Sequence, residues 1–410
     1  MSKRPRSESD SVADGPSHSL AANVAQNVST ADSTENPTQA FIKMLDMTAI
    51  APGTEPAHFE LIATRLMQGF HLCVASKATP PVINAYEFLE VEFYWYCHAT
   101  GHYDPFTHAA EEQRQAGNWY FHRAPRRAPL GANLNAPIPS LKTAGYRSGT
   151  RKGLDLTFGI PAGEDGPEAY GGILLRALRN VDTKNVTCGP SLLTDEVLRA
   201  AGADSIPDLV NALWSGNTSA FLSTDQKEPR SSQVFLQPVP DPTPGSKPPA
   251  ATRMYTSPRI GLDLNRLQAV AEAKPSHPRI KFVGRPYRFF MQPRLLGTPR
   301  PQTVYGLLSM CDLGVISRAQ LIDVLAIKPT QLDTFIGYIN DGRKAGKDGI
   351  KEFLGEKGKG AAQSVQKFLK MAGVLECILD LKKDPGDQAS SAKKQKLGKT
   401  LTELFGPKKS

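Results

Sequence analysis

The chain has 410 residues, with 49 lysines and arginines against 40 acidic residues and a formal charge of +9. No apolar run reaches the roughly 18 residues that a membrane helix needs, so we expect no membrane span. The polar start, residues 1–10, lacks the apolar stretch of a secretory signal. Five scattered cysteines exclude a disulfide framework and any Cys-x-x-Cys zinc site, and they suit a reducing compartment.

The positive charge is concentrated in the C-terminal part of the chain. Residues 1–250 carry 21 basic and 26 acidic side chains, whereas residues 251–300 carry 10 against 2 and residues 341–410 carry 16 against 9. Two basic segments of this kind favour a polyanionic partner, and nucleic acid is the usual one. The alternative is a solvated basic surface that has no partner.

The first 37 residues are rich in Ser, Ala, Asn and Asp and predict a disordered tail, because they cannot offset the entropy lost on ordering. Its cluster Lys3-Arg4-Pro5-Arg6 is of the nuclear-localisation type. From Phe41 to Phe70 the apolar residues recur at a helical period.

The clearest strand covers residues 87–97, where aromatic residues alternate with other side chains over several steps. Period two places Glu90, Glu92, Tyr94 and Tyr96 on one face of this strand. Further strands are predicted at 119–123, 154–158 and 173–178, followed by helices at about 191–201 and 206–214.

The C-terminal part of the chain starts with a Pro-rich segment, 226–256, which predicts a long surface loop. Strands are predicted at 281–284 and 287–291, and residues 303–380 are expected to be entirely helical. Within them Ser317 and Gln320 form a capping box, and Asp341-Gly342 predicts a helix stop. Residues 384–410 predict a basic disordered tail.

Glu90 and Glu92 are candidates for acid–base chemistry, because strand geometry puts them roughly 6–7 Å apart. Mutual repulsion and apolar surroundings would raise the pKa of one of them, which suits a general base that activates water. The alternative is a solvent-facing strand whose acids pair with surface lysines.

His98, His102 and His108 follow this strand, with Asp104 between them. Their spacing matches no standard metal site, so we expect a hydrogen-bonding histidine beside a pocket and no metal.

Arg176 interrupts an apolar strand, where a guanidinium is costly unless a carboxylate or phosphate pairs with it. A structural acid in the core and a functional partner are both open. Basic residues beside aromatic ones are what a protein needs to stack a base and hold its backbone, and Arg123, Arg126 and Arg127 lie beside Trp119 and Tyr120. Aromatic residues at alternating positions are equally typical of a core.

Taken together, the segments that hold these residues resemble the methylpurine-DNA glycosylases of the 3-methyladenine type, over roughly residues 82–292. The matching segments, in chain order, are Glu90-Val-Glu92-Phe-Tyr94, Asp104-Pro-Phe-Thr-His108, Tyr170 to Leu178, Gly189-Pro-Ser-Leu-Leu193, Ser257-Pro-Arg-Ile-Gly261 and Pro286-Tyr-Arg-Phe-Phe290.

The resemblance implies a mixed α/β (α+β) fold, a single domain with a curved antiparallel sheet and peripheral helices. We therefore expect a disordered tail at 1–37, a glycosylase-like domain at 38–300, a helical region at 303–380 and a basic tail at 384–410. The helical region is either a DNA-holding module or an appendage packed on the main domain.

The resemblance further implies a nuclear enzyme of base excision repair. This enzyme would hydrolyse the N-glycosidic bond of alkylated or deaminated purines flipped from double-stranded DNA. Glu92 would activate the water and Arg176 would orient Glu92 or a phosphate. The base pocket would be formed by Tyr94, His108, Trp119, Tyr120 and Asp155, with Asp155 at the position of the family's asparagine. Tyr146 is the candidate for the side chain that wedges into the duplex.

DNA phosphates would be held by arginines of the basic segment 251–300 and by those that follow Trp119 and Tyr120. These arginines are Arg123, Arg126, Arg127, Arg259, Arg285 and Arg288. We expect a monomer that needs no cofactor. The C-terminal segment containing Leu401, Leu404 and Phe405 is similar to a sliding-clamp-binding box. Two other functions stay open: a non-catalytic nucleic-acid-binding protein on the same fold, and a hydrolase of free nucleosides.

Overall fold

The computed structural model of the chain describes residues 36–124, 144–161, 169–223, 225–226, 228–240 and 252–379. The predicted tails lie outside these ranges, apart from the residues at 36–37. The basic cluster at Lys3–Arg6, the pair Arg126 and Arg127, and the clamp-binding residues Leu401, Leu404 and Phe405 also lie outside the described residues.

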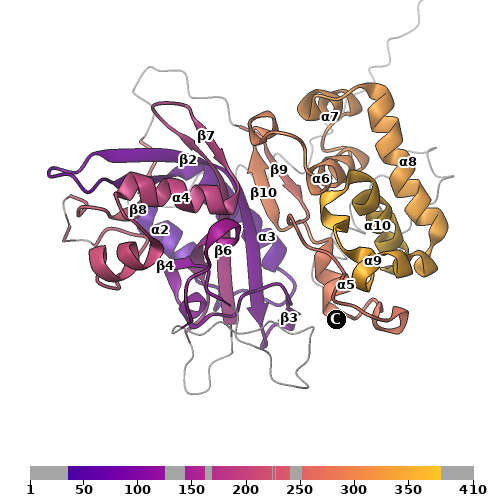
Figure 1. Ribbon diagram of the computed structural model, residues 1–410, viewed down its shortest axis with the longest axis horizontal. Helices are drawn as coiled ribbons and strands as arrows, with labels where there is room; N and C mark the ends of the chain where they lie inside the picture. Colours follow the sequence, from indigo (N-terminus) through magenta and orange to yellow (C-terminus); the bar gives the residue numbers. More distant parts are fainter. Residues whose placement is uncertain are drawn as a thin grey trace, which may run out of the picture.

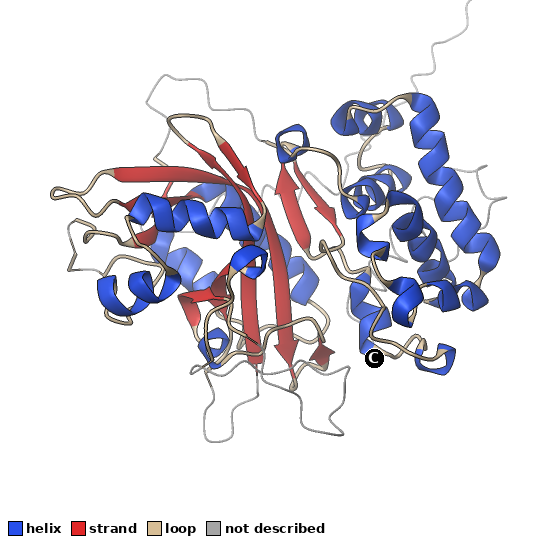
Figure 2. Cartoon of the chain, in the orientation of Figure 1, coloured by secondary structure: helices blue, strands red, loops and turns tan. Residues whose placement is uncertain are grey.

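The described residues form a mixed α/β fold whose centre is a curled, antiparallel half-barrel sheet, as expected (Figures 1 and 2). The main path of the sheet runs β4-β5-β6-β2-β1-β8, with β10 pairing β2 and β9, β3 pairing β2, and β7 pairing β6. The strands are β1 (Phe70–Ala75), β2 (Ile83–Cys97), β3 (His102–Tyr103), β4 (Ala116–Phe121), β5 (Leu154–Phe158), β6 (Ala169–Asn180), β7 (Val186–Cys188), β8 (Val234–Pro238), β9 (Met254–Ser257) and β10 (Arg288–Met291).

Strand β2 is the centre of this sheet and includes the predicted strand at 87–97. One of its edges pairs with β6 along almost its whole length. The other edge pairs first with β1, then with β10 opposite Glu90–Glu92, and finally with β3. The strand therefore links three parts of the chain that are far apart in sequence.

A β-bulge in β2 decides which side chains face the core. Tyr86 and Phe88 belong to the main apolar core, and so do Val91 and Phe93, although the spacing between Phe88 and Val91 is odd. The register against β6 shifts between these residues, which lets the strand change phase. The result places Glu90 and Glu92 on the face opposite the core.

The helices cover the two faces of the sheet unequally. Helix α3 packs on the apolar face, where the Phe59 ring lies 5.0 Å from the Phe93 ring. The α-helices are α2 (Pro37–Met44), α3 (Glu55–Gly69), α4 (Pro190–Ala201), α5 (Pro278–Val283), α6 (Pro301–Asp312), α7 (Arg318–Leu325), α8 (Pro329–Ala345), α9 (Gly355–Gly358) and α10 (Val365–Ile378). Short 3-10 turns lie at Glu111–Arg114, Gly149–Arg151, Val270–Glu272, Pro293–Leu296, Lys347–Glu352 and Ala361–Gln363, and a π turn at Asp208–Leu213.

The C-terminal helices pack against the β9–β10 end of the sheet (Figure 1). Tyr255 and Phe290 of these strands share one apolar cluster with Val304 and Leu307 of α6. The helical region predicted at 303–380 is therefore helical, as expected, and it shares a core with residues assigned to the preceding domain. The Ser317–Gln320 capping box is also present, at the start of α7.

Two local predictions are wrong. Residues 281–283 belong to helix α5 and Gly284 is its C-cap, so no strand forms here, because Pro278 starts a helical turn that His277 caps. Helix α8 continues through Asp341-Gly342 to Ala345. Gly342 is instead a point of close helix packing, since a Cβ there would lie 2.0 Å from the Lys370 carbonyl oxygen of α10. The helix expected at about 206–214 is present, with residues 208–213 in π-helical geometry.

The Pro-rich segment 226–256 is not entirely a loop. Val234, Phe235 and Leu236 are buried in β8, which pairs with β1, and β9 starts at Met254. Proline flanks this short apolar strand rather than interrupting it, which is why the composition concealed it. Among the described residues, no helix has both the length and the apolar character needed to cross a bilayer.

Candidate functional site

The polar face of the sheet brings the candidate side chains into one row. Asp155 of β5 lies opposite Leu174 of β6, Leu174 opposite Glu92 of β2, and Glu92 opposite Arg288 of β10. Residues directly opposite in neighbouring strands point to the same face. The structure therefore places Asp155 and Glu92 on one surface, two strands apart.

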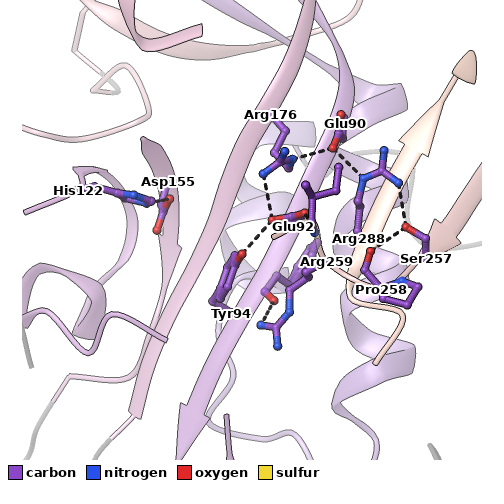
Figure 3. A network of polar contacts seen from close by, with 12 residues as sticks. Glu90, Glu92, Tyr94, His122, Asp155, Arg176, Ser257, Pro258, Arg259 and Arg288 are labelled. Carbon is purple, nitrogen blue, oxygen red and sulfur yellow. Dashed lines mark hydrogen bonds and ion pairs between the residues drawn. The ribbon is translucent and has the colours of Figure 1, made fainter. Parts of the chain in front are cut away.

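The Glu92 carboxylate is completely buried and is held by three donors (Figure 3). Its Oε2 accepts hydrogen bonds from the Tyr94 hydroxyl at 2.9 Å and from Arg176 Nη1 at 3.4 Å. Its Oε1 accepts one from the backbone N–H of Ile260 at 2.6 Å. A carboxylate has about four acceptor positions, so these three hydrogen bonds leave one position that no described donor fills.

Tyr94 and Arg176 both donate hydrogen bonds to Glu92, and the orienting role expected of Arg176 stays a prediction. Burial and the neighbouring Glu92 charge raise the pKa of Tyr94 well above its usual value. The hydroxyl therefore stays protonated and remains a donor to the carboxylate. Arg176 provides a positive charge that partly offsets the cost of burying Glu92.

Arg176 belongs to a buried ionic group with Glu90 and Arg288. The Nε atoms of both arginines lie 2.7 Å from Glu90 Oε1. Burial alone would raise the pKa of Glu90, but Arg288 and Arg176 outweigh it and lower that pKa to about 2. Glu90 is therefore an anion under all ordinary conditions and not a general acid.

Arg288 also donates to the hydroxyls of Ser257 and Thr303, and its side chain is 1% exposed. The prediction that Arg288 contacts DNA from the surface is therefore wrong. Its role is to connect the ionic group to β9 and to helix α6.

Arg259 is the second correction, because its side chain is 0% exposed. Its guanidinium donates to both oxygens of Asp104, at 2.5 and 3.1 Å, and to the Phe93 carbonyl. It also lies 4.5 Å from the centre of the Tyr94 ring. Arg259 thus fixes residues 257–261 to the Asp104 segment and holds the Ile260 N–H toward Glu92.

A second polar cluster lies on β4 and β5, and the sequence did not indicate its central member, His122. His122 Nε2 lies 2.8 Å from Asp155 Oδ1, while Gln113 donates to Asp155 Oδ2 at 3.1 Å. Figure 3 shows this pair on the strands beside the Glu92 group. Asp155 therefore orients His122 and Gln113.

His108 packs against His122, with ring centres 4.1 Å apart, and its Nδ1 lies 3.5 Å from the Tyr120 hydroxyl. Burial and then the charges of His122 and Arg147 lower the pKa of His108 well below 6.5. His108, Tyr120 and Asp155 are thus brought together, and their role as a base pocket stays a prediction.

The close approach of these groups depends on Gly172 of β6. A Cβ there would lie 2.5 Å from both Asp155 Oδ2 and Gln113 Nε2. Gly172 pairs with Tyr94 of β2, so the missing side chain lies between the two polar clusters.

Trp119 is a third correction. Its side chain is buried in the main core, on the opposite face, and its indole N–H donates to the Val234 carbonyl at 2.8 Å. It therefore cannot stack on a base beside Glu92. Tyr120, the next residue, points to the polar face, because successive residues of a strand alternate.

Arg123 and Arg285, two further arginines expected to contact DNA, differ in their exposure and contacts. Arg123 donates to Glu112, to the Ala144 carbonyl and to the Tyr146 hydroxyl, so it orders the segment that carries the proposed wedge. Arg285 is half-exposed and lies 5.7 Å from the Phe282 ring, and its contact with DNA stays a prediction.

The histidines after β2 are not gathered around one point. His102 lies within hydrogen-bond distance of the Trp95 carbonyl and the Tyr287 hydroxyl, whereas His108 contacts Tyr120. Asp104 is engaged by Arg259. In the part of the chain that the structure describes, no three His, Cys, Asp or Glu side chains are grouped as a metal site requires.

No family model matches the chain. The chain is similar to the uncharacterized protein L759 of Acanthamoeba polyphaga mimivirus, with 25% identity over 189 residues. This alignment covers 44% of the chain and 71% of the viral protein.

Proposed function

We propose that the protein is a nuclear DNA base-excision glycosylase, which hydrolyses the N-glycosidic bond of a damaged purine flipped from duplex DNA. The observation that carries the proposal is the Glu92 carboxylate, which is buried and held by Tyr94, Arg176 and the Ile260 N–H, with one acceptor position that no described donor fills. Such a preorganised carboxylate suits a general base.

In this mechanism a water that enters with the substrate hydrogen-bonds to the unfilled acceptor position of Glu92 and gives a proton to the carboxylate as the water oxygen attacks C1′ of the sugar. The bond between C1′ and the purine nitrogen breaks, and its electron pair leaves with the base. The sugar develops oxocarbenium character, which the nearby negative charge of Glu92 stabilises. An alkylated or deaminated purine is the better leaving group, because it carries the electron pair more readily.

The remaining site residues support base binding. Tyr94, Tyr120 and His108 would line the base pocket, and His122 joins them because Asp155 holds it in place. Extrusion of the nucleotide costs a few kcal/mol. Basic residues outside the core, Arg285 among them, would offset that cost through phosphate contacts.

The complete burial of Glu92, whose exposed fraction is 0%, favours a second candidate function. A carboxylate enclosed by three donors also serves as a structural clamp between β2, β6 and residues 257–261. The protein would then be a nucleic-acid-binding protein on this fold that recognises modified bases without cleaving them.

The experiment that separates these functions uses the full chain in excess over a duplex containing hypoxanthine or ethenoadenine, followed by alkaline cleavage. A glycosylase yields a break at the modified base and none in the unmodified duplex. Salt-sensitive binding of both duplexes without any break would support the second candidate. Turnover of free inosine, with the duplex unchanged, would assign the activity to nucleosides instead.

A further inference from the structure

A small cavity opens beside the ionic group of Arg176, Glu90 and Arg288, on the side away from the His122 cluster. Its volume is about 40 Å³. A cavity that holds one water has a volume of about 10–15 Å³. This cavity therefore has room for about three waters or one tetrahedral oxyanion, but not for a purine. The charged residues of its lining are Glu90, Arg176, Arg288 and Arg300.

The charges around this cavity are not balanced. Three guanidinium groups face two carboxylates, since Glu90 is shared by Arg176 and Arg288 and Glu92 is bound by Arg176. Arg300 is exposed, and its guanidinium makes no hydrogen bond or ion pair with the residues that the structure describes. One positive charge is therefore left without a partner at the cavity.

The backbone around the cavity also favours an anion. Gly189, which lines it, directly precedes helix α4, and this helix has no side-chain cap at its N-terminus. An uncapped helix N-terminus adds a partial positive charge to that of the arginines.

We propose that this cavity binds a phosphate oxyanion, with Arg300 as its mobile clamp and Arg176 and Arg288 as its fixed walls. Arg176 contacts both the cavity and Glu92, so the bound phosphate is adjacent to the hydrolytic centre. The assignment of this phosphate to the backbone of the target DNA strand rests on the proposed function. A free phosphate group has the same chemistry and is the simplest probe.

The first test compares the thermal unfolding of the full chain in phosphate and in chloride at equal ionic strength. The wild-type protein should show a saturable rise in Tm that is specific for phosphate. Arg300→Ala should weaken phosphate binding about tenfold, and Arg300→Lys should restore part of it, because lysine keeps the charge but loses the planar fork.

Arg294→Ala is the matched control, because Arg294 is an exposed arginine of the same connecting segment that pairs with Asp323 and does not line the cavity. It should bind phosphate as the wild type does. An equal phosphate response in Arg300→Ala and the wild type, or no response in either, would overturn the proposal.

The second test measures the salt dependence of binding to an unmodified duplex. If the phosphate comes from DNA, Arg300→Ala should reduce the slope of log K against log salt by about one unit. Loss of phosphate binding with an unchanged slope supports the site with a free phosphate group as its ligand. Neither readout needs base excision, so a protein that binds phosphate through Arg300 but excises nothing would contradict only the proposed function.

Discussion

The two faces of strand β2 are buried to a similar degree by different means. On one face Phe93 is enclosed by aromatic rings, including Phe59 at 5.0 Å and Phe289 at 5.3 Å. On the other face Glu90 and Glu92 are enclosed by arginines and a tyrosine. Both carboxyl side chains are nearly inaccessible to solvent, with 7% and 0% exposure.

This difference matters because the two kinds of burial have different consequences for stability. Apolar burial stabilises a fold in proportion to the area removed from water. Buried ion pairs stabilise it little, and well-packed apolar side chains often serve as well or better. The charged face is therefore poorly explained by stability alone, and this is the general reason to regard it as the functional face.

The largest expected effects on the free energy of unfolding come from removing Phe93 from the apolar face or the charge of Glu90 from the charged face. The pH dependence of the two effects should differ. Phe93→Ala should lower the free energy of unfolding by about 3–5 kcal/mol at every pH. Glu90→Gln should cost about 3 kcal/mol near pH 6, because the arginines lower the pKa of Glu90 from 4.5 to about 2.

The direction of the pH effect follows from that lowered pKa. Ionised Glu90 stabilises the fold fully above about pH 4.5, and this contribution is lost as the pH falls through about 2. Urea denaturation between pH 6 and pH 2 should therefore show the wild type and Glu90→Gln converging. A constant difference across this range would mean that Glu90 acts through packing, as Phe93 does.

A smaller effect is expected at Gly172, where the two polar clusters meet. Gly172→Ala would push a methyl group to 2.5 Å from Asp155 Oδ2 and Gln113 Nε2, and so break the hydrogen bond between them. Urea denaturation should show a loss of about 1–3 kcal/mol.

Gly284→Ala is the control for this variant, because a Cβ there meets nothing within 4 Å and its φ of −96° suits any residue. Its effect should stay within about 0.5 kcal/mol. An equal loss of unfolding free energy in both glycine variants would show that the cluster of His122, Asp155 and Gln113 adjusts without cost. The polar face of the sheet would then be less rigid than we describe.

The alternation of side chains in β2 was predictable from the sequence, and so was the joint face of Glu90, Glu92 and Tyr94. The curved antiparallel sheet, expected from the family resemblance, is also present. The β-bulge was not predictable, because it is a register shift in the pairing of β2 with β6, a strand far away in the sequence. Trp119 shows the same limit, because the sequence does not reveal which face of the sheet an aromatic strand residue occupies.

The partners of the charged groups were the least predictable part of the site. The Ile260 N–H is a backbone donor and carries no side-chain signature at all. Arg259 and Arg288 looked like surface charge in a basic segment, yet each has its carboxylate partner more than 150 positions earlier in the chain. His122 follows an aromatic strand with no motif around it, and only the fold places Asp155 beside it.

The most direct test of the proposed mechanism is the single-turnover excision of hypoxanthine from a duplex by Glu92→Gln. Glu87→Gln is the matched control, since Glu87 lies on the same strand and pairs with Arg179. We expect Glu92→Gln to bind the duplex normally but to release the base roughly 100- to 10,000-fold more slowly, with Glu87→Gln close to the wild type. Excision by Glu92→Gln at the wild-type rate would contradict the role of Glu92 as the base that activates water.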